Sequence, residues 1–453
     1  MEQQFLETVA TQPELLAQHY TEAGLTALAL PYWQRAGQYA LQRSAYVEAI
    51  SHLTRGLELL SSLPETVEHI RQELDVQMAL ASALTATKGL AAPEAGHALD
   101  RARQLCQQLG ETRQLLLVLG GLVPFYINRG EYQTAREVGE QMLSLAQSVP
   151  DPAAIANAHI MLGNALSVLG ELGSARTHLE QGIAFYTAQQ HRSQGFIIAT
   201  THQRVFGLSR LAQTLWLLGY PDQAVQRSQE ALTAARTLAS PAGVVTALFF
   251  AAEVSMRCRD EHKTYEQAEA ALVLAREHGL AFRVAQATIL RGWGLVEQGQ
   301  GEVGIAQICQ GLAALHATGA EGPLSLLVEA YGRVGQIEDG LRVVAEALAM
   351  SAGMGESRGT VELHRLKGEL LLTRSAEHQA EAETCFHQAL AVARHQQAKS
   401  LELRAAMSWA RLWLQQGKQA ESYELLAPIY GWFTEGLDTA DLQEARVLLK
   451  SLT

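Results

Sequence analysis

Cysteine, aromatic residues and long apolar runs are all scarce in this chain of 453 residues. Cys106, Cys258, Cys309 and Cys385 are dispersed with no paired spacing, which is typical of reduced, mostly buried thiols in the cytoplasm. No apolar run reaches the roughly 18 residues that a membrane span requires. The acidic start of the chain lacks the apolar core of a signal peptide. We therefore expect a cytoplasmic protein with no membrane partner.

Positive charge is also in short supply. The chain has 35 Lys and Arg against 47 Asp and Glu, which leaves a formal net charge of −12. Binding to phosphate backbones needs a basic footprint, and no Lys/Arg-rich run or aromatic-plus-basic cluster occurs. We expect no nucleic-acid partner.

Motifs for catalysis and cofactor binding are missing or better explained by packing. No P-loop pattern occurs, and residues 299–304 spell G-x-G-x-x-G within a helical context instead of after a β-strand. Glu383 and His387 have a spacing that can hold a metal, but a structural zinc takes four ligands. A surface ion pair is the favoured interpretation of these two residues. We expect no enzymatic activity, no cofactor and no metal site.

What the sequence does contain is a recurring helix-turn-helix cassette, clearest at residues 157–186. Its skeleton is a small residue in a first helix, a turn glycine, then a small, an apolar and a small residue in a second helix. Gly163, Gly170, Ala175, Leu179 and Gly182 occupy these places. One such unit cannot bury its apolar face alone, so copies must stack into a solenoid.

The cassette recurs about ten times along the chain. Its second-helix markers are Ala49, Ala95, Ala135, Ala175, Ala224, Ala268, Gly304, Gly340, Ala382 and Ser422. Their spacing is nearer 40 residues than the roughly 34 of a minimal tetratricopeptide repeat.

Glycine has two roles in the cassette. Gly37, Gly163, Gly292 and Gly368 lie inside helices, where glycine costs roughly 1 kcal/mol relative to alanine. We expect the missing Cβ atom to permit close approach of the partner helix. A second set should end the first helices in the left-handed conformation. This set is Gly130, Gly170, Gly219, Gly299, Gly335 and Gly417.

The pattern predicts an all-α fold, a right-handed α-α superhelix of about ten helix pairs with a C-terminal capping helix. We expect one solenoid over residues 1–453. Its first unit covers about 12–64, further repeats cover 65–430 and a capping helix covers 431–453. In that last helix, Leu442, Ala445, Leu448 and Leu449 should face the preceding unit.

First helices are expected to line a concave groove that binds a partner. Asn and Arg side chains there can hydrogen-bond a peptide backbone or its carboxylates, and Trp can anchor an apolar side chain. The alternative is that the tryptophans pack between helices and the arginines are merely solvated. The candidate residues are Asn157, Asn164, Arg210, Gln213, Trp216, Trp293, Arg333, Arg365 and Arg411.

Both ends of the repeat region carry a family resemblance. Residues 12–60 resemble the start, and residues 398–449 the end, of the tetratricopeptide region in large bacterial signalling proteins. Those proteins join a class III adenylate/guanylate cyclase or a DNA-binding domain to an AAA-type ATPase and then to this solenoid. The resemblance implies a regulatory sensor arm, with an ATPase or cyclase domain as a partner. The chain then represents an excised fragment, a truncated product or a stand-alone relative.

Two functions remain open from the sequence. One is a non-catalytic scaffold that binds a protein or peptide. The other is a small-molecule sensor whose curvature changes when a ligand binds. A small-molecule pocket needs several aromatic side chains in adjacent repeats, and only Trp216 and Trp293, two repeats apart, are candidates. That count favours the protein or peptide partner.

Overall fold

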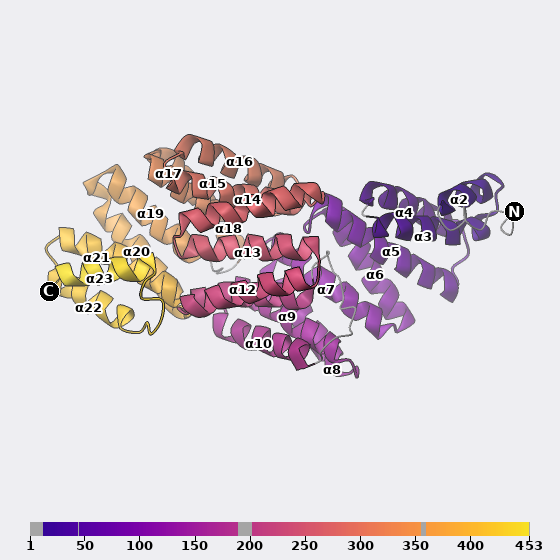
Figure 1. Cartoon of the computed structure of the whole chain (residues 1–453), viewed down its shortest axis with the longest axis horizontal. Coiled ribbons are helices and arrows are strands. Elements are labelled where there is room, and N and C mark those ends of the chain that lie inside the picture. The colour runs from indigo at the N-terminus through magenta and orange to yellow at the C-terminus, as the bar shows by residue number, and fades with distance from the viewer. Residues whose placement is uncertain (1–11, 44, 189–201, 355–358, 453) are drawn as a thin grey trace.

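The computed structural model describes residues 12–43, 45–188, 202–354 and 359–452. These residues form α-helices joined by short turns, one short 3-10 helix η2 (Ala376–His378) and no β-strand (Figure 1). The expected all-α solenoid of helix pairs is confirmed.

Ten helix pairs follow one another along the chain. The first helices are α3 (Thr26–Gln42), α5 (Val67–Lys88), α7 (Thr112–Asn128), α9 (Pro152–Val168), α11 (Gln203–Leu217), α13 (Pro241–Arg257), α15 (Ala281–Glu297), α17 (Leu324–Val334), α19 (Thr360–Arg374) and α21 (Lys399–Gln415). The second helices are α4 (Tyr46–Leu60), α6 (Pro93–Leu109), α8 (Tyr132–Gln147), α10 (Leu172–Ala188), α12 (Pro221–Thr237), α14 (Glu261–Glu277), α16 (Gly301–His316), α18 (Ile337–Met354), α20 (Gln379–His395) and α22 (Gln419–Tyr430). α2 (Pro13–Glu22) precedes these pairs and α23 (Ala440–Ser451) follows them.

The glycines inside first helices lie against the apolar residue of the second helix. A Cβ atom at Gly163 would lie 2.8 Å from Cγ of Leu179, and one at Gly368 would lie 2.5 Å from Cε1 of Phe386. The six turn glycines named above have φ between +75° and +91°. Both roles expected of glycine are therefore present.

One marker was assigned a helical turn too late. In α14 the fourth residue, which corresponds to the marker in every other second helix except α6, is Thr264 and not Ala268. Thr264 is fully buried and lies 40 residues after Ala224 and 40 before Gly304. Its hydroxyl donates to the carbonyl of Asp260 at 2.7 Å, which satisfies the polar atom and lets threonine take the place of a small residue.

The G-x-G-x-x-G segment is part of the repeat. Gly299 ends the turn after α15 with φ +83°, and Gly301 begins α16. A Cβ atom at Gly304 would lie 2.5 Å from the carbonyl oxygen of Gly292. These glycines serve helix packing.

Successive turns of the superhelix touch one another. α5 contacts α15, and α11 contacts α21, so helices five pairs apart lie side by side. The backbone N–H of Glu321, in the loop after α16, donates to the carbonyl of Asn128 in α7 at 2.9 Å. The hydroxyl of Ser400 in α21 donates to the carbonyl of Trp216 in α11 at 2.5 Å. Buried apolar side chains of α7–α11 and α20–α23 join in one continuous core.

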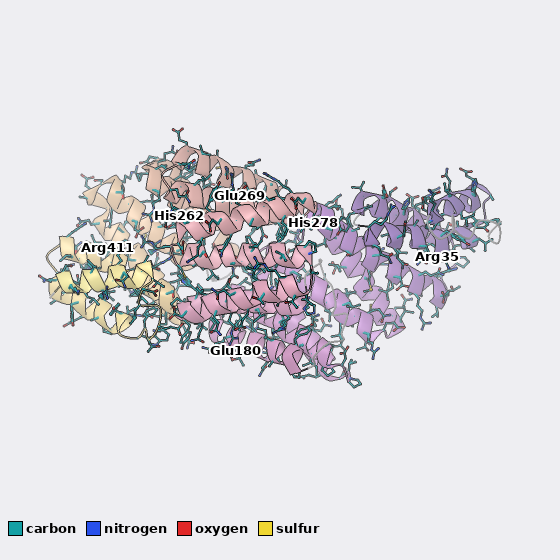
Figure 2. The ribbon with its side chains drawn as sticks, viewed as in Figure 1. Arg35, Glu180, His262, Glu269, His278 and Arg411 are labelled. Carbon is teal, nitrogen blue, oxygen red and sulfur yellow. The ribbon has the colours of Figure 1, made fainter. Side chains whose placement is uncertain are left out.

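The end of the chain packs back on the array. α23 buries Leu442, Ala445 and Leu448, and Leu449 is partly buried against the same core. Exposed polar side chains such as Glu180 and His262 lie on second helices and point outward (Figure 2). Within the described ranges no helix has both the length and the apolar character that crossing a membrane requires.

Candidate functional site

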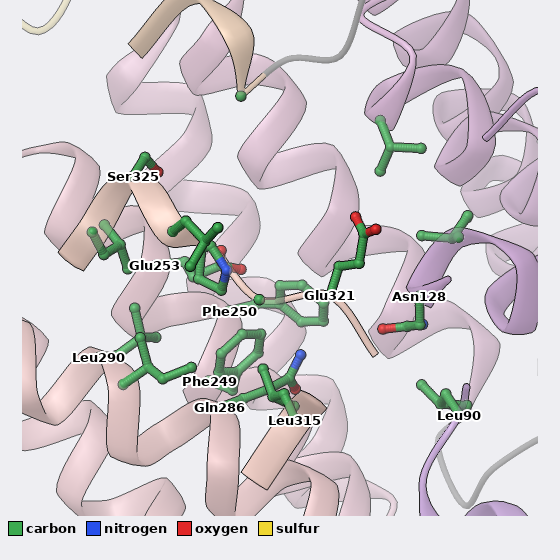
Figure 3. A pocket seen from close by; sticks show the side chains of 18 of the residues that line it. Leu90, Asn128, Phe249, Phe250, Glu253, Gln286, Leu290, Leu315, Glu321 and Ser325 are labelled. Carbon is green, nitrogen blue, oxygen red and sulfur yellow. The ribbon is translucent and has the colours of Figure 1, made fainter. Parts of the chain in front are cut away.

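A cavity of about 320 Å³ lies inside the superhelix, where the first helices face one another (Figure 3). α7, α9, α11, α13, α15 and α19 all contribute to its walls. The segment 321–326, which comprises the end of the loop before α17 and the first turn of α17, closes one side because the next superhelical turn returns there. The concave surface thus forms a partly open cavity in this part of the molecule.

Four phenylalanines from three consecutive pairs gather in this cavity. Phe206 comes from α11, Phe249 and Phe250 from α13, and Phe282 from α15. The ring centroids of Phe249 and Phe250 are 5.0 Å apart, and those of Phe206 and Phe250 are 6.1 Å apart, both edge to face. This arrangement favours an apolar ligand group against the rings.

Two arginines lie over these rings. The guanidinium of Arg210 is 4.7 Å from the Phe250 centroid, and that of Arg283 is 5.3 Å from the Phe249 centroid. Arg283 donates to the neutral Gln286 amide at 2.7 Å. Burial lowers the pKa of Arg283 to about 10, although the more distant Glu253 opposes this shift. The cavity therefore holds a partly buried cation whose described hydrogen-bond partner is neutral.

Other polar groups face the same space. Asn164 is only 1% exposed, and no donor among the described residues reaches its Oδ1 atom. Glu321 lies across from Phe250 in Figure 3. Burial raises the pKa of Glu321 above its ordinary value. An unpartnered buried oxygen costs about 1–3 kcal/mol, which a ligand N–H would offset.

A second, charged cluster lies between α17, α19, α21 and α23 around a cavity of about 240 Å³. Arg365 pairs with Glu362 and with Glu369, each at 2.7 Å, and Arg404 pairs with Asp441 at 2.7 Å. Burial alone would raise the pKa of Glu362, but Arg365 and Arg404 lower it to about 2. These charges satisfy one another, so the cluster links elements of the array.

The predicted site residues separate into three groups. Asn164 and Arg210 line the interior cavity. The three predicted arginines of the charged cluster are held in ion pairs: Arg365 as above, Arg333 with Glu297 at 2.9 Å and Arg411 with Glu444 at 2.7 Å. The remaining residues, Asn157, Gln213, Trp216 and Trp293, are buried.

These four buried residues do not form the expected open groove. The face of Trp216 is covered by Arg404, 4.9 Å from its ring, because α21 of the next superhelical turn lies there. Trp293 donates its indole N–H to Glu329 at 3.0 Å. Gln213 donates to Glu253 and accepts from Arg210, so it positions cavity residues without lining the cavity. Asn157 lies on α9 between its neighbours α7, α10 and α11.

The sequence interpretation missed the phenylalanines because only tryptophans were considered as aromatic anchors. The adjacent pair Phe249-Phe250 was the available signal. Neighbouring residues of a helix point about 100° apart, so two adjacent rings cannot both lie in one narrow helix contact. The criterion of several aromatic side chains in adjacent repeats is met, by residues other than Trp216 and Trp293.

Glu383 has a structural role of its own. Its carboxylate accepts from the indole N–H groups of Trp413 at 2.7 Å and Trp409 at 3.3 Å. His387 lies edge-on to the Trp409 ring. The expected surface ion pair is therefore replaced by indole hydrogen bonds. Across the described segments, no three His, Cys, Asp or Glu side chains gather as metal ligands would.

Comparison with known proteins supports the fold. No family model matches the chain. An uncharacterized protein of Rhizobium meliloti (strain 1021) is 24% identical over 404 residues, which cover 88% of this chain and 39% of that protein. The chain thus spans well under half the length of this curated relative.

Two solved structures share the architecture. The Rap protein in complex with competence and sporulation factor has a TM-score of 0.52 and 13% identity, covering 87% of this chain and 99% of that chain. A chain of the APC/C hetero-tetramer Cut9–Hcn1 has a TM-score of 0.52 and 11% identity, covering 94% of this chain and 76% of that chain. At such identities the likeness shows a common fold, the tetratricopeptide-type helical solenoid.

Proposed function

We propose that this chain is a non-catalytic binding module whose interior cavity holds a short peptide. The observation that carries the proposal is the convergence of phenylalanine rings, Arg283 and the unpartnered Asn164 oxygen on one cavity. Its volume of about 320 Å³ is at the lower end of the range for ligand sites and far below that of a folded domain. A peptide supplies the apolar side chains and amide groups that this lining complements.

We also propose that the solenoid acts as a regulatory arm for an ATPase or cyclase domain. The support is the resemblance of residues 12–60 and 398–449 to the sensor region of such signalling proteins. The cavity lies between superhelical turns, so a ligand that contacts α13 and the segment 321–326 stabilises the closed superhelix. A domain attached to the solenoid would sense that change in curvature.

A small non-peptide ligand is the second candidate. The four converging phenylalanines favour it, because they form the aromatic pocket that a small-molecule sensor needs. Peptide and non-peptide ligands differ in their backbone amides, and the unpartnered Asn164 oxygen supports a ligand with an amide N–H.

The test is selection of peptides from a random tetrapeptide library, with the washed complex analysed by mass spectrometry. We expect the wild type to retain a defined subset of apolar peptides. Phe250→Leu should reduce retention at least tenfold because the ring surface in the cavity is lost. The control is Val225→Leu, at an exposed position of α12, which should retain the wild-type subset.

Equal retention by both variants would place peptide binding outside the cavity. Retention of no peptide at all, together with a non-peptide compound that co-purifies with the wild type and not with Phe250→Leu, would establish the second candidate in its place.

A further inference from the structure

The polar groups of the interior cavity are spaced along its wall and differ in sign. Arg283 lies on α15 beside the rings of Phe249 and Phe250, and Glu321 lies in the loop after α16. Asn164 is on α9, on another wall of the same cavity. The cavity thus combines an apolar surface with a cation on one side, an anion on another and an amide acceptor. Such a surface is complementary to a molecule that carries the opposite groups.

Arg283 has no ion pair with a carboxylate of the described residues, although Glu253 acts on it electrostatically. Its described hydrogen-bond partner is the neutral Gln286, and Glu253 is occupied by the amide of Gln213. Buried cations are stable when they are paired. A ligand carboxylate beside Arg283 would make a charge-assisted hydrogen bond inside the cavity.

Glu321 is the acidic group of the cavity and is complementary to a ligand cation. Its carboxylate lies over Gly130, where a Cβ atom would be 2.9 Å from the carboxylate oxygens, so the glycine makes room for it. Its backbone N–H donates to Asn128, which fixes the loop against α7. An ammonium group that enters the cavity would neutralise this desolvated anion.

We infer that the cavity binds a very short apolar peptide with both ends free, its carboxylate at Arg283, its ammonium at Glu321 and an amide N–H at Asn164. This inference rests on the proposed function and specifies its ligand. The cavity volume of about 320 Å³ is at the lower end of the range for ligand sites and favours a very short peptide. The apolar side chains of the peptide lie against Phe249 and Phe282.

The experiment uses the dipeptides Leu-Phe and Phe-Leu, each also prepared with an N-terminal acetyl group or a C-terminal amide, in isothermal titration calorimetry. We expect saturable binding of at least one unmodified dipeptide to the wild type. Either modification should weaken its affinity at least tenfold, because each removes one charge from the ligand.

Two variants test which residue binds each end of the dipeptide. Arg283→Gln should bind the amidated and free dipeptides equally yet still discriminate against the acetylated form. Glu321→Gln should show the reverse pattern. A misfolded variant would lose both discriminations, so selective loss separates direct contact from damage to the fold. Arg342→Gln, in an exposed ion pair of α18, is the control and should behave as the wild type.

The inference is overturned if neither dipeptide binds saturably or if blocking either end leaves the affinity unchanged. Should the tetrapeptide selection succeed while the dipeptides fail, the proposed peptide-binding function stands and only this ligand assignment falls.

Discussion

At the scale of single residues, a pair of histidines forms a contact between two helices that depends on pH. Nδ1 of His159 on α9 lies 2.9 Å from Nδ1 of His178 on α10. One ring must donate and the other accept, so the contact requires at least one neutral imidazole. Burial lowers the pKa of both rings below the ordinary value of 6.5, and the charge of His178 lowers that of His159 further.

The pair predicts a loss of stability in mild acid. A histidine whose pKa is lowered in the folded state binds protons more readily when unfolded, so stability is complete above pH 6.5 and falls as the pH drops below it. The melting temperature should fall between pH 7.5 and 5.5. His178→Gln should reduce this fall, because a glutamine oxygen accepts from protonated His159. The exposed His262→Gln should melt as the wild type does at both pH values, and an undiminished fall in His178→Gln would refute this assignment.

Residues whose role depends on size alone were predictable from sequence. Small residues such as Gly163 and Ala175 recur at equivalent positions of the repeats because neighbouring helices leave no room for larger groups there. Phe250 and Arg283 were not predicted, because their role depends on what lies across the cavity, several helix pairs away. The spacing of residues within one helix pair does not show which residues lie across the cavity.

At the scale of elements, three glycines set the separation of α15 and α16. A Cβ atom at Gly304 would lie 2.5 Å from the carbonyl oxygen of Gly292, and one at Gly311 would lie 2.7 Å from that of Ala285. Backbone atoms cannot rotate away as a flexible side chain does. The two helices can accept a methyl group only by moving apart.

Gly304→Ala should therefore destabilise the array by about 1–3 kcal/mol, as overpacking of a core does. The matched change Gly173→Ala, on the exposed face of α10, meets only a side-chain oxygen at 3.4 Å. It should be neutral or stabilise by up to about 1 kcal/mol, because alanine favours a helix. Thermal unfolding followed by circular dichroism measures both. Similar melting temperatures for the two variants would mean that α15 and α16 are not in rigid contact.

The sequence predicted which segments form helices better than it predicted the alignment of one repeat. The periodic small residues place the pairs, but α14 carries Thr264 where alanine or glycine was sought. A hydroxyl bonded to the preceding helical turn is buried almost as readily as a methyl group. Composition alone does not reveal that bond.

At the scale of the whole molecule, closure of the superhelix decides which inner residues a partner can reach. Contacts between α5 and α15 and between α11 and α21 follow from small rotations summed over five helix pairs. No sequence motif encodes rotations that add up over several helix pairs. The sequence therefore identified the inner residue Trp216, while the return of the next turn covered it with Arg404.

Arg404 joins helices of different superhelical turns. It donates to the carbonyl of Arg257 on α13 at 2.7 Å and pairs with Asp441 on α23 at 2.7 Å. Arg404→Met leaves Asp441 buried without this partner and should destabilise the fold by about 3 kcal/mol. It should also increase the radius of gyration in small-angle X-ray scattering as α21 separates from α11 and α13. Arg342→Met, at an exposed ion pair, should change neither quantity. A lower melting temperature with an unchanged radius would show that the apolar core shared by α7–α11 and α20–α23 holds the turns together without Arg404.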